Sequence, residues 1–299
     1  MTRQPVSAKK STTVRIQALR VAMIKKAFEL GERVAPGQMS RWALDLWCTL
    51  PGNAGRRRDE RPAPGLRSSV IMDGRQLAVE TWGTGSPVYL MHGWGGWRGQ
   101  LGGFVRPLAE SGYRVVALDA PSHGDSDPGS MGKGRGNGLE FARALSAVAA
   151  VHGRPEAVIA HSFGCATTAV AMRDGLDVGR LLLIAPSVEP TTYVRAVAKI
   201  FGFGPRTMDR LIDRIERLAE RPLADFDPRT MPSAETLPPT LIIHDRRDKE
   251  IPYAEGEALA AGWPNAELIT TDGLGHQRIL RDAAVIDRVA DFARTVPSR

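Results

Sequence analysis

From about residue 67 onward, short apolar runs alternate with segments of helical periodicity, and this alternation constrains the fold more than any other feature of the chain. The runs are rich in Val, Leu and Ile and too short for helices, so they are expected to be buried strands. Strands separated by helices pair in parallel, because the chain crosses over through each helix before it re-enters the sheet. We therefore predict an α/β fold, a mostly parallel open sheet flanked by helices. The expected strands are residues 88–91, 114–118, 157–160, 180–184, 240–244 and 266–270, preceded by a hairpin at 68–72 and 76–81.

Residues 187–236 interrupt the alternation, because they show helical periodicity alone. We expect this segment to be a helical cap inserted over the carboxyl edge of the sheet, where open α/β sheets keep their sites. The remaining organisation is an N-terminal helical extension with a linker at 1–66 and a core in two parts, at 67–186 and 237–299. One clean apolar stripe runs along the cap, through Met208, Leu211, Ile212, Ile215, Leu218 and Ala219.

Basic residues concentrate at the N-terminus. Of the 40 Lys and Arg residues in this 299-residue chain, 13 lie in residues 1–66, which hold only 5 of the 33 Asp and Glu residues. This segment therefore carries a charge of +8, whereas residues 67–299 sum to −1, for the net charge of +7. A nucleic-acid surface on the body is disfavoured, because such a surface needs clustered basic residues on the folded face.

Two helices are expected in this segment, at 14–34 and 39–50, followed by a linker at 52–66 with three consecutive arginines. The helices either present a solvated basic face while docked on the body, which is the usual meaning of a charge run, or form a dimer contact, or contact an anionic membrane. No run predicts a membrane span or a secretory signal. Two distant cysteines, Cys48 and Cys165, predict no disulfide framework and a reducing, cytoplasmic compartment.

The strongest chemical signal is the pentapeptide AHSFG at residues 160–164, which follows an expected strand and opens an expected helix. A sharp strand-to-helix turn lifts the Ser162 hydroxyl above the sheet and directs free helix N–H groups toward whatever it attacks. Gly164 supplies the small residue that such a turn needs, while Ala160 stands where the G-x-S-x-G pattern has its first glycine. The alternative is that Ser162 is a helix N-cap without chemistry.

Three further loops follow expected strands. The run HGWGG at 92–96 can turn a backbone N–H toward a developing oxyanion, and the run at 119–126 carries polar side chains that fit a scaffolding role. A serine nucleophile also needs a base, and the base needs an acceptor that fixes its tautomer. The run HDRRD at 244–248 and the Gly275-His276 pair supply both after later strands, in the chain order Ser, Asp, His.

With these five motifs in order, residues 68–296 resemble the α/β-hydrolase superfamily, in its serine esterase-like form with a small helical cap. The resemblance implies that Ser162 is the nucleophile, His276 the general base and Asp248 the residue that orients the imidazole, with Asp245 as a rival for that last role. It implies an oxyanion hole formed by the backbone N–H groups of Trp94 and Phe163. The reaction would be acyl transfer to water, and a serine at the elbow argues against carbon–halogen and epoxide cleavage, for which relatives carry Asp.

The sequence leaves the substrate open. The leading hypothesis is a carboxylic-ester hydrolase; alternatives are a thioesterase, lactonase or amidase with the same triad, or a non-catalytic ligand-binding or scaffold member of the fold. No metal or organic cofactor is implied, and the glycine-rich run at 132–138 matches no phosphate loop. Five aromatic residues either line an apolar acyl pocket or simply pack the cap: Trp94, Trp97, Tyr193, Phe201 and Phe203.

Overall fold

A computed structural model describes residues 7–52, 62–231 and 237–294 of the chain, so most of the expected linker at 52–66 lies outside the described residues. The chain divides into two compact units. One is a helical unit made of Met1–Trp47 and Thr191–Leu218, and the other, here called the body, is made of Cys48–Pro190 and Ala219–Arg299. The expected N-terminal extension and most of the expected cap therefore belong to the same unit.

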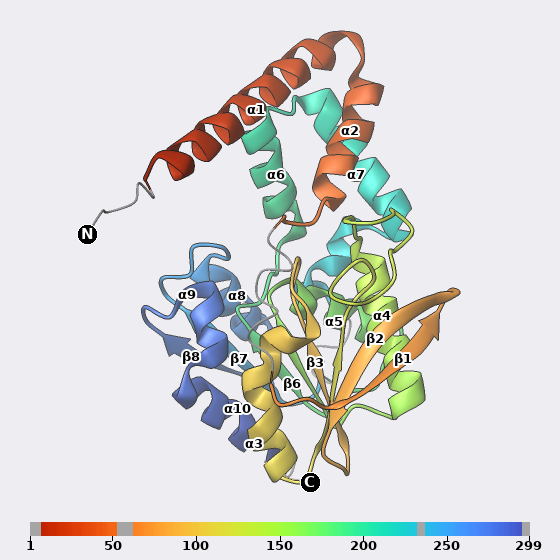
Figure 1. The fold of residues 1–299 in the computed structure, drawn as a ribbon, viewed down its shortest axis with the longest axis vertical. Helices are drawn as coiled ribbons and strands as arrows, with labels where there is room; N and C mark the ends of the chain where they lie inside the picture. Colours follow the sequence, from red (N-terminus) through yellow and green to blue (C-terminus); the bar gives the residue numbers. More distant parts are fainter. Residues whose placement is uncertain (1–6, 53–61, 232–236, 295–299) are drawn as a thin grey trace, which may run out of the picture. The chain divides into compact units, whose positions relative to one another are not determined.

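The body is built on one eight-stranded sheet in the order β1-β2-β4-β3-β5-β6-β7-β8. The first two strands form an antiparallel hairpin, β2 pairs antiparallel with β4, and every other neighbouring pair is parallel (Figure 1). The predicted α/β class is thus confirmed. The strands are β1 (Leu66–Met72), β2 (Arg75–Trp82), β3 (Pro87–Met91), β4 (Arg114–Leu118), β5 (Ala157–His161), β6 (Leu181–Ile184), β7 (Thr240–Asp245) and β8 (Ala266–Thr271).

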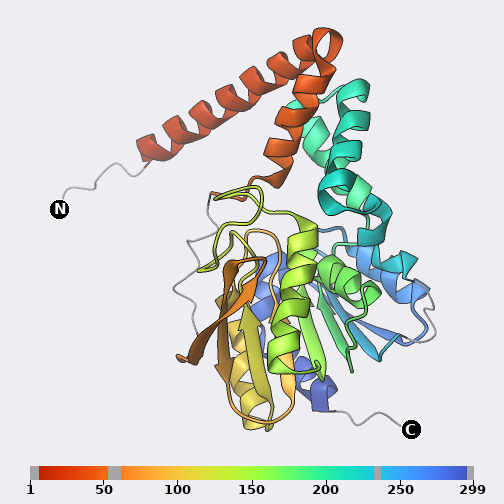
Figure 2. The ribbon, with the colours of Figure 1, turned by 90° about the vertical axis from the view of Figure 1, so that its right-hand side faces the viewer.

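Helices cover both faces of this sheet (Figures 1 and 2). Alternate residues of the central strands enter two separate cores: in β3, Tyr89 and Met91 pack on one face, and Val88 and Leu90 on the other. This alternation is the geometric consequence of a strand that is buried on both faces. The first core includes residues of α4 (Gly138–His152), α5 (Phe163–Arg173) and α8 (Tyr253–Gly262), and the second residues of η1 (Arg98–Phe104), α3 (Val105–Glu110) and α10 (Ala283–Arg294).

The helical unit joins segments whose contacting residues lie about 175 residues apart in the sequence. Phe28 is fully buried and packs against Trp42, with ring centroids 4.8 Å apart, and against Phe203, at 4.4 Å. The Glu32 carboxylate accepts hydrogen bonds from the backbone N–H groups of Arg206 (2.7 Å) and Thr207 (3.1 Å), and so caps an inserted helix. Its helices are α1 (Ser7–Val34), α2 (Pro36–Cys48), α6 (Pro190–Phe201) and α7 (Pro205–Ala219).

Candidate active site

Ser162 occupies the turn between β5 and α5 in a conformation that non-glycine residues rarely adopt, with φ 56° and ψ −124°. Such strain persists only where the surrounding structure enforces it, and it concentrates at functional sites. The Ser162 N–H donates to the Ile184 carbonyl over 2.9 Å. Its side chain makes no helix-cap hydrogen bond, so the structure does not support the N-cap alternative. A Cβ at position 164 would lie 2.6 Å from the His92 carbonyl oxygen, which explains the glycine there.

The HGWGG loop lies directly against this serine. A Cβ added to Gly93 would lie 2.9 Å from the Ser162 Cβ, so glycine is needed for the close approach. His92 holds the loop: its Nδ1–H donates to the Gly93 carbonyl (2.8 Å), and its Nε2 accepts from the Ala120 N–H (3.1 Å). Burial lowers the pKa of His92 to about 4, so the ring is neutral at pH 7 and keeps this tautomer. The peptide bond between Gly93 and Trp94, which includes the Trp94 N–H, therefore starts at a residue that lies directly beside Ser162.

His276 and Asp248 form a direct pair, in which Nδ1–H of the imidazole donates to Oδ2 of the carboxylate over 2.7 Å. Both side chains are buried, and the other Asp248 oxygen accepts from the N–H groups of Glu250 (2.8 Å) and Ile251 (2.9 Å). Burial works to raise the pKa of Asp248, but the hydrogen bonds from His244, His276 and Ile251 hold it well below its ordinary value. The carboxylate is therefore ionised and fixes the tautomer of the His276 ring.

Asp245, the other candidate for the residue that orients the imidazole, has different hydrogen-bond partners. Its carboxylate accepts hydrogen bonds from the Thr271 hydroxyl (2.7 Å) and from the N–H groups of Gly273 (3.2 Å) and Leu274 (2.8 Å). Burial works to raise its pKa, but hydrogen bonds from the Thr271 hydroxyl and from the N–H groups of Gly275, Leu274 and Arg247 lower it to about 2. Asp245 therefore anchors the loop that carries His276, whereas Asp248 contacts the imidazole itself.

The serine and the histidine are connected through His161. Its ring lies 4.6 Å from the His276 ring, and its Nε2–H donates to the His276 backbone carbonyl over 3.0 Å. Within the described residues, Ser162 Oγ makes no hydrogen bond to His276. Hydrogen bonds of this kind are often long in an unliganded site and shorten when substrate is bound.

Two further buried groups lie near the site, and the sequence indicated only one of them, His123 in the 119–126 run. Arg98, 2% exposed, donates to Glu80 (3.1 Å), Asp119 and Asp125 (2.9 Å). Burial alone would lower its pKa, but these carboxylates raise it above the ordinary arginine value. His123 Nε2 accepts from Gly95 N–H over 3.1 Å, which links the 119–126 loop to the HGWGG loop and supports its scaffolding role. No local pattern could reveal Arg98, because its partners come from separate segments.

The expected pocket aromatics fall into different environments. Trp94 stacks on Phe141, with centroids 6.0 Å apart, and its edge meets Phe163 at 5.7 Å. Trp97 is only 2% exposed, with the Arg98 guanidinium 5.9 Å from its ring centroid. Phe203 stacks on Phe201 at 6.1 Å and packs on Phe28 within the helical unit, which also contains Tyr193. For Trp97 and Phe203, packing within their own unit is the arrangement observed.

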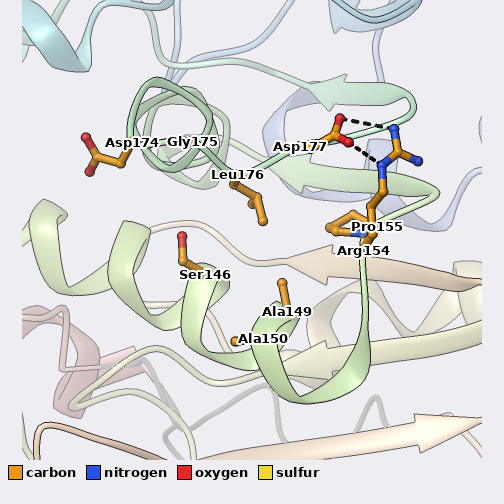
Figure 3. A pocket seen from close by; sticks show the side chains of 9 residues that line it. All are labelled: Ser146, Ala149, Ala150, Arg154, Pro155, Asp174, Gly175, Leu176 and Asp177. Carbon is orange, nitrogen blue, oxygen red and sulfur yellow. Dashed lines mark hydrogen bonds and ion pairs between the residues drawn. The ribbon is translucent and has the colours of Figure 1, made fainter.

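A depression of about 420 Å³ lies elsewhere on the body, between the last turns of α4 and the segment that follows α5 (Figure 3). Its rim carries an ion pair in which Arg154 binds Asp177 through two hydrogen bonds, of 2.5 and 3.0 Å. These residues precede β5 and β6, whereas Ser162 follows β5, so the depression lies at the opposite edge of the sheet. None of the expected site residues lines it. Among the described residues, no cluster of His, Cys, Asp and Glu could hold a metal, and no helix is long and apolar enough to cross a membrane.

Comparison with known proteins agrees with this architecture. A model of the alpha/beta hydrolase family matches residues 88–292, and the chain belongs to that family. It is 29% identical over 266 residues to a 2-hydroxy-6-oxononadienedioate/2-hydroxy-6-oxononatrienedioate hydrolase of Dechloromonas aromatica, a match that covers 73% of this chain and 90% of the relative.

Two solved structures share the fold. An esterase from Exiguobacterium antarcticum is 18% identical, with a TM-score of 0.59, and the match covers 77% of this chain and 100% of the esterase. A meta-cleavage product hydrolase from Pseudomonas fluorescens is 17% identical, with a TM-score of 0.55, and the match covers 75% and 96%. At these identities the likeness concerns the fold, so the choice of substrate has to be argued from the site.

Proposed function

We propose that this protein is a serine hydrolase that cleaves a carboxylic ester through an acyl-enzyme on Ser162, with His276 as general base and Asp248 as its orienting acid. The observation that carries the proposal is the buried 2.7 Å contact between His276 Nδ1 and an ionised Asp248. A serine in a strained turn, with no helix-cap hydrogen bond, precedes helix α5 and faces the glycine loop. An oriented base and a serine at a sharp strand-to-helix turn are two of the parts that a serine nucleophile uses.

In the proposed reaction, His276 Nε2 takes the proton of Ser162 as its oxygen attacks the ester carbonyl carbon. The N–H groups of Trp94 and Phe163 donate to the resulting oxyanion. The C–O bond to the alcohol then breaks, and the imidazolium gives its proton to the departing oxygen. A water molecule repeats these steps on the acyl-enzyme, releasing the acid and restoring the serine. Asp248 remains ionised throughout and stabilises the imidazolium.

Carbon–carbon bond hydrolysis is a second candidate, favoured by the names of the curated relatives. The same serine attack would then expel a carbon leaving group, which must be protonated on carbon. The relatives' named substrates are dicarboxylates, whose binding calls for cationic partners. Arg98, the buried cation after the HGWGG loop, is already paired with three carboxylates and so offers no free charge to such a substrate. The substrate panel described next distinguishes the two reactions.

A substrate panel tests the proposal. Purified protein should hydrolyse short-chain p-nitrophenyl esters, and Ser162→Ala should remove nearly all of that rate. A thioester, a lactone, an anilide and a 2-hydroxy-6-oxo-dienoate, assayed in parallel, separate the alternatives that share the triad. A fluorophosphonate probe should label the wild-type protein at Ser162. Ester turnover that survives Ser162→Ala would overturn the assignment, and absence of both turnover and labelling would favour a non-catalytic role.

A further inference from the structure

Helix α1 leaves an apolar face uncovered. Its opposite side packs within the helical unit, where Phe28 is buried and Gly31 closely approaches Met39. At about 100° per residue, the four large apolar side chains of α1 that are more than half exposed fall within an arc of about 60°. We call these four side chains the α1 stripe: Leu19 is 61% exposed, Met23 57%, Leu30 74% and Val34 84%.

Basic residues border the stripe. Lys26 and Arg33 lie on one side of it and Arg20 on the other, and all three are exposed. Of the two acidic residues on α1, Glu32 is engaged at the start of α7 by the Arg206 and Thr207 N–H groups and the Thr207 hydroxyl. Glu29 is exposed and lies beyond Arg33, farther from the apolar side chains than the three cations. The exposed face of α1 therefore combines large apolar side chains with a positive border.

We infer that the α1 stripe binds an anionic phospholipid surface. Apolar side chains at this spacing can enter the boundary between headgroups and acyl chains while the flanking cations contact lipid phosphates. A second copy of the chain is a poorer occupant, because pairing two stripes would bring two positive borders together. The +8 charge of residues 1–66 favours the same partner.

Vesicle sedimentation of the full-length protein tests this surface. Phosphatidylcholine vesicles with about 30% phosphatidylglycerol should bind the protein, and binding should weaken at about 0.5 M NaCl. Leu19→Ser with Leu30→Ser should lower the bound fraction about fivefold. The matched controls Ile71→Ser and Val151→Ser, at sites 62% and 66% exposed on β1 and α4, should leave it unchanged. Equal binding to neutral vesicles, equal losses in the controls, or a dimer that only the stripe variants dissociate would overturn the inference.

A second observation concerns residues 48–51, here called the strap, which run beside the glycine-rich loop at 132–138. Leu50 N–H donates to the Gly134 carbonyl over 2.8 Å, and Gly136 N–H donates to the Cys48 carbonyl over 2.9 Å. Thr49 forms an antiparallel bridge with Arg135 between these two bonds. The strap therefore adds a short strand-like pairing to the body.

The strap and its partner loop both touch the oxyanion region. A Cβ on Gly95, whose φ is +69°, would lie 2.8 Å from Pro51 Cδ. A Cβ on Gly136 would lie 3.3 Å from both the Trp94 ring and the His123 ring. Trp94 and Gly95 are thus enclosed between Pro51, the glycine-rich loop and His123.

We propose that the strap is a positioning element for the Trp94–Gly95 turn, a role that rests on the proposed function. Pro51 limits where the Gly95 backbone can move, and the peptide next to it carries the Trp94 N–H. Donor placement matters more for the transition state than for the bound ester, because the charge on oxygen develops during attack. Disturbing the strap should therefore lower kcat more than it changes KM.

A single substitution and a double substitution test the role of the strap. Gly95→Ala should lower kcat about tenfold with KM within about twofold, and adding Pro51→Gly should restore part of the loss by removing the clash. Gly74→Ala is the matched control, because Gly74 has a similar φ of +76° but nothing within 4 Å. Equal loss in that control, or no recovery in the double variant, would overturn the role.

Hydrogen exchange separates this inference from the proposed function. Pro51→Gly should speed amide exchange at Trp94 and Gly95 and leave β5 unchanged, whether or not an ester is turned over. If exchange rises as expected but the wild type cleaves no ester, the proposed function is wrong and the strap contact stands. If exchange at Trp94 and Gly95 does not change, the strap does not position the turn.

Discussion

His161 donates its Nε2–H to the backbone carbonyl of His276 over 3.0 Å, so the residue before the serine holds the residue that carries the imidazole. Burial and the neighbouring His276 hold the pKa of His161 well below its ordinary value, so the donor stays neutral. The link spans 115 residues of sequence and joins the carboxyl end of β5 to α9 (Gly275–Arg278), the short helix that follows β8.

Replacing His161 tests this link. His161→Phe keeps a ring in the core but leaves the His276 carbonyl without its donor, which should cost about 1–3 kcal/mol in the free energy of unfolding. The rate of ester cleavage should fall about tenfold at unchanged KM, because the base is held less well. His161→Gln, which retains an N–H donor, should recover part of both. Urea unfolding and steady-state kinetics measure them, and a Phe variant with wild-type kcat would contradict the positioning role.

Substitution of Asp248 and substitution of Asp245 should have different effects on the rate of ester cleavage. Asp248→Asn removes the charge that stabilises the imidazolium, so kcat should fall about 10³-fold or more; because this buried carboxylate also accepts from the Glu250 and Ile251 N–H groups, stability should fall as well. Asp245→Asn should mainly destabilise the fold, by about 1–3 kcal/mol, because its oxygens accept several loop donors. Kinetics and denaturation of both variants decide this, and a larger rate loss at Asp245 would make it the orienting acid.

Stability should fall as the pH drops below about 6.5. His92 has its pKa lowered to about 4 and His123 to about 3, mainly by burial, so the unfolded chain takes up protons that the folded chain refuses. For His92 alone this amounts to about 3 kcal/mol between pH 6.5 and pH 4. Asp245, with its pKa lowered to about 2, adds a further loss as the pH falls from about 4 to 2.

Urea titrations at a series of pH values measure this slope. His123→Asn should flatten the part above pH 4, and Asp245→Asn the part below it. A free energy of unfolding that stays constant from pH 6.5 to pH 4 would show that these histidines are not held neutral.

Gly164 should be intolerant of any side chain. An added Cβ would meet the backbone carbonyl oxygens of His92 at 2.6 Å and Met91 at 2.8 Å, and backbone cannot rotate away as a side chain can. Gly164→Ala should therefore destabilise the protein by about 2–3 kcal/mol or more and remove activity. Gly262→Ala, at a position with nothing within 4 Å, should change stability by less than about 1 kcal/mol. Thermal melting compares the two, and equal shifts would contradict the argument.

A chain that begins at Leu66 should lose order in α6 and α7. It lacks Phe28, which packs on Phe203, and Glu32, which caps α7. The eight-stranded sheet draws on residues 66–271 and should still form. Limited proteolysis should cut the shortened chain between residues 191 and 218 much faster than the full chain. Equal resistance in both would show that the inserted helices need no N-terminal partner.

Local sequence pattern determined the sheet and the position of the serine. The alternation of short apolar runs placed β3 to β8 to within about two residues, because strand burial imposes a repeating local constraint. Residues 98–110, by contrast, form two short helices, η1 and α3, and Leu101 inside η1 has a non-helical φ of −93° and ψ of 15° beside two glycines. The sequence could predict the serine turn because the geometry of that turn depends on residues that are adjacent in the sequence.

Tertiary structure alone decided the features that depend on distant partners. Family resemblance favoured Asp248 over Asp245 as the residue that orients the imidazole, but only the path of the loop shows that Asp248 contacts His276 and that Asp245 binds the 271–274 segment. From the local sequence alone, Arg98 would be expected at the surface, yet three carboxylates from separate segments surround it. Likewise, the apolar periodicity of α1 or of α7 predicts that each helix buries one face, but it does not predict that the two helices belong to the same unit. Sequence pattern records which face a segment buries, whereas the identity of what covers that face is set by long-range packing.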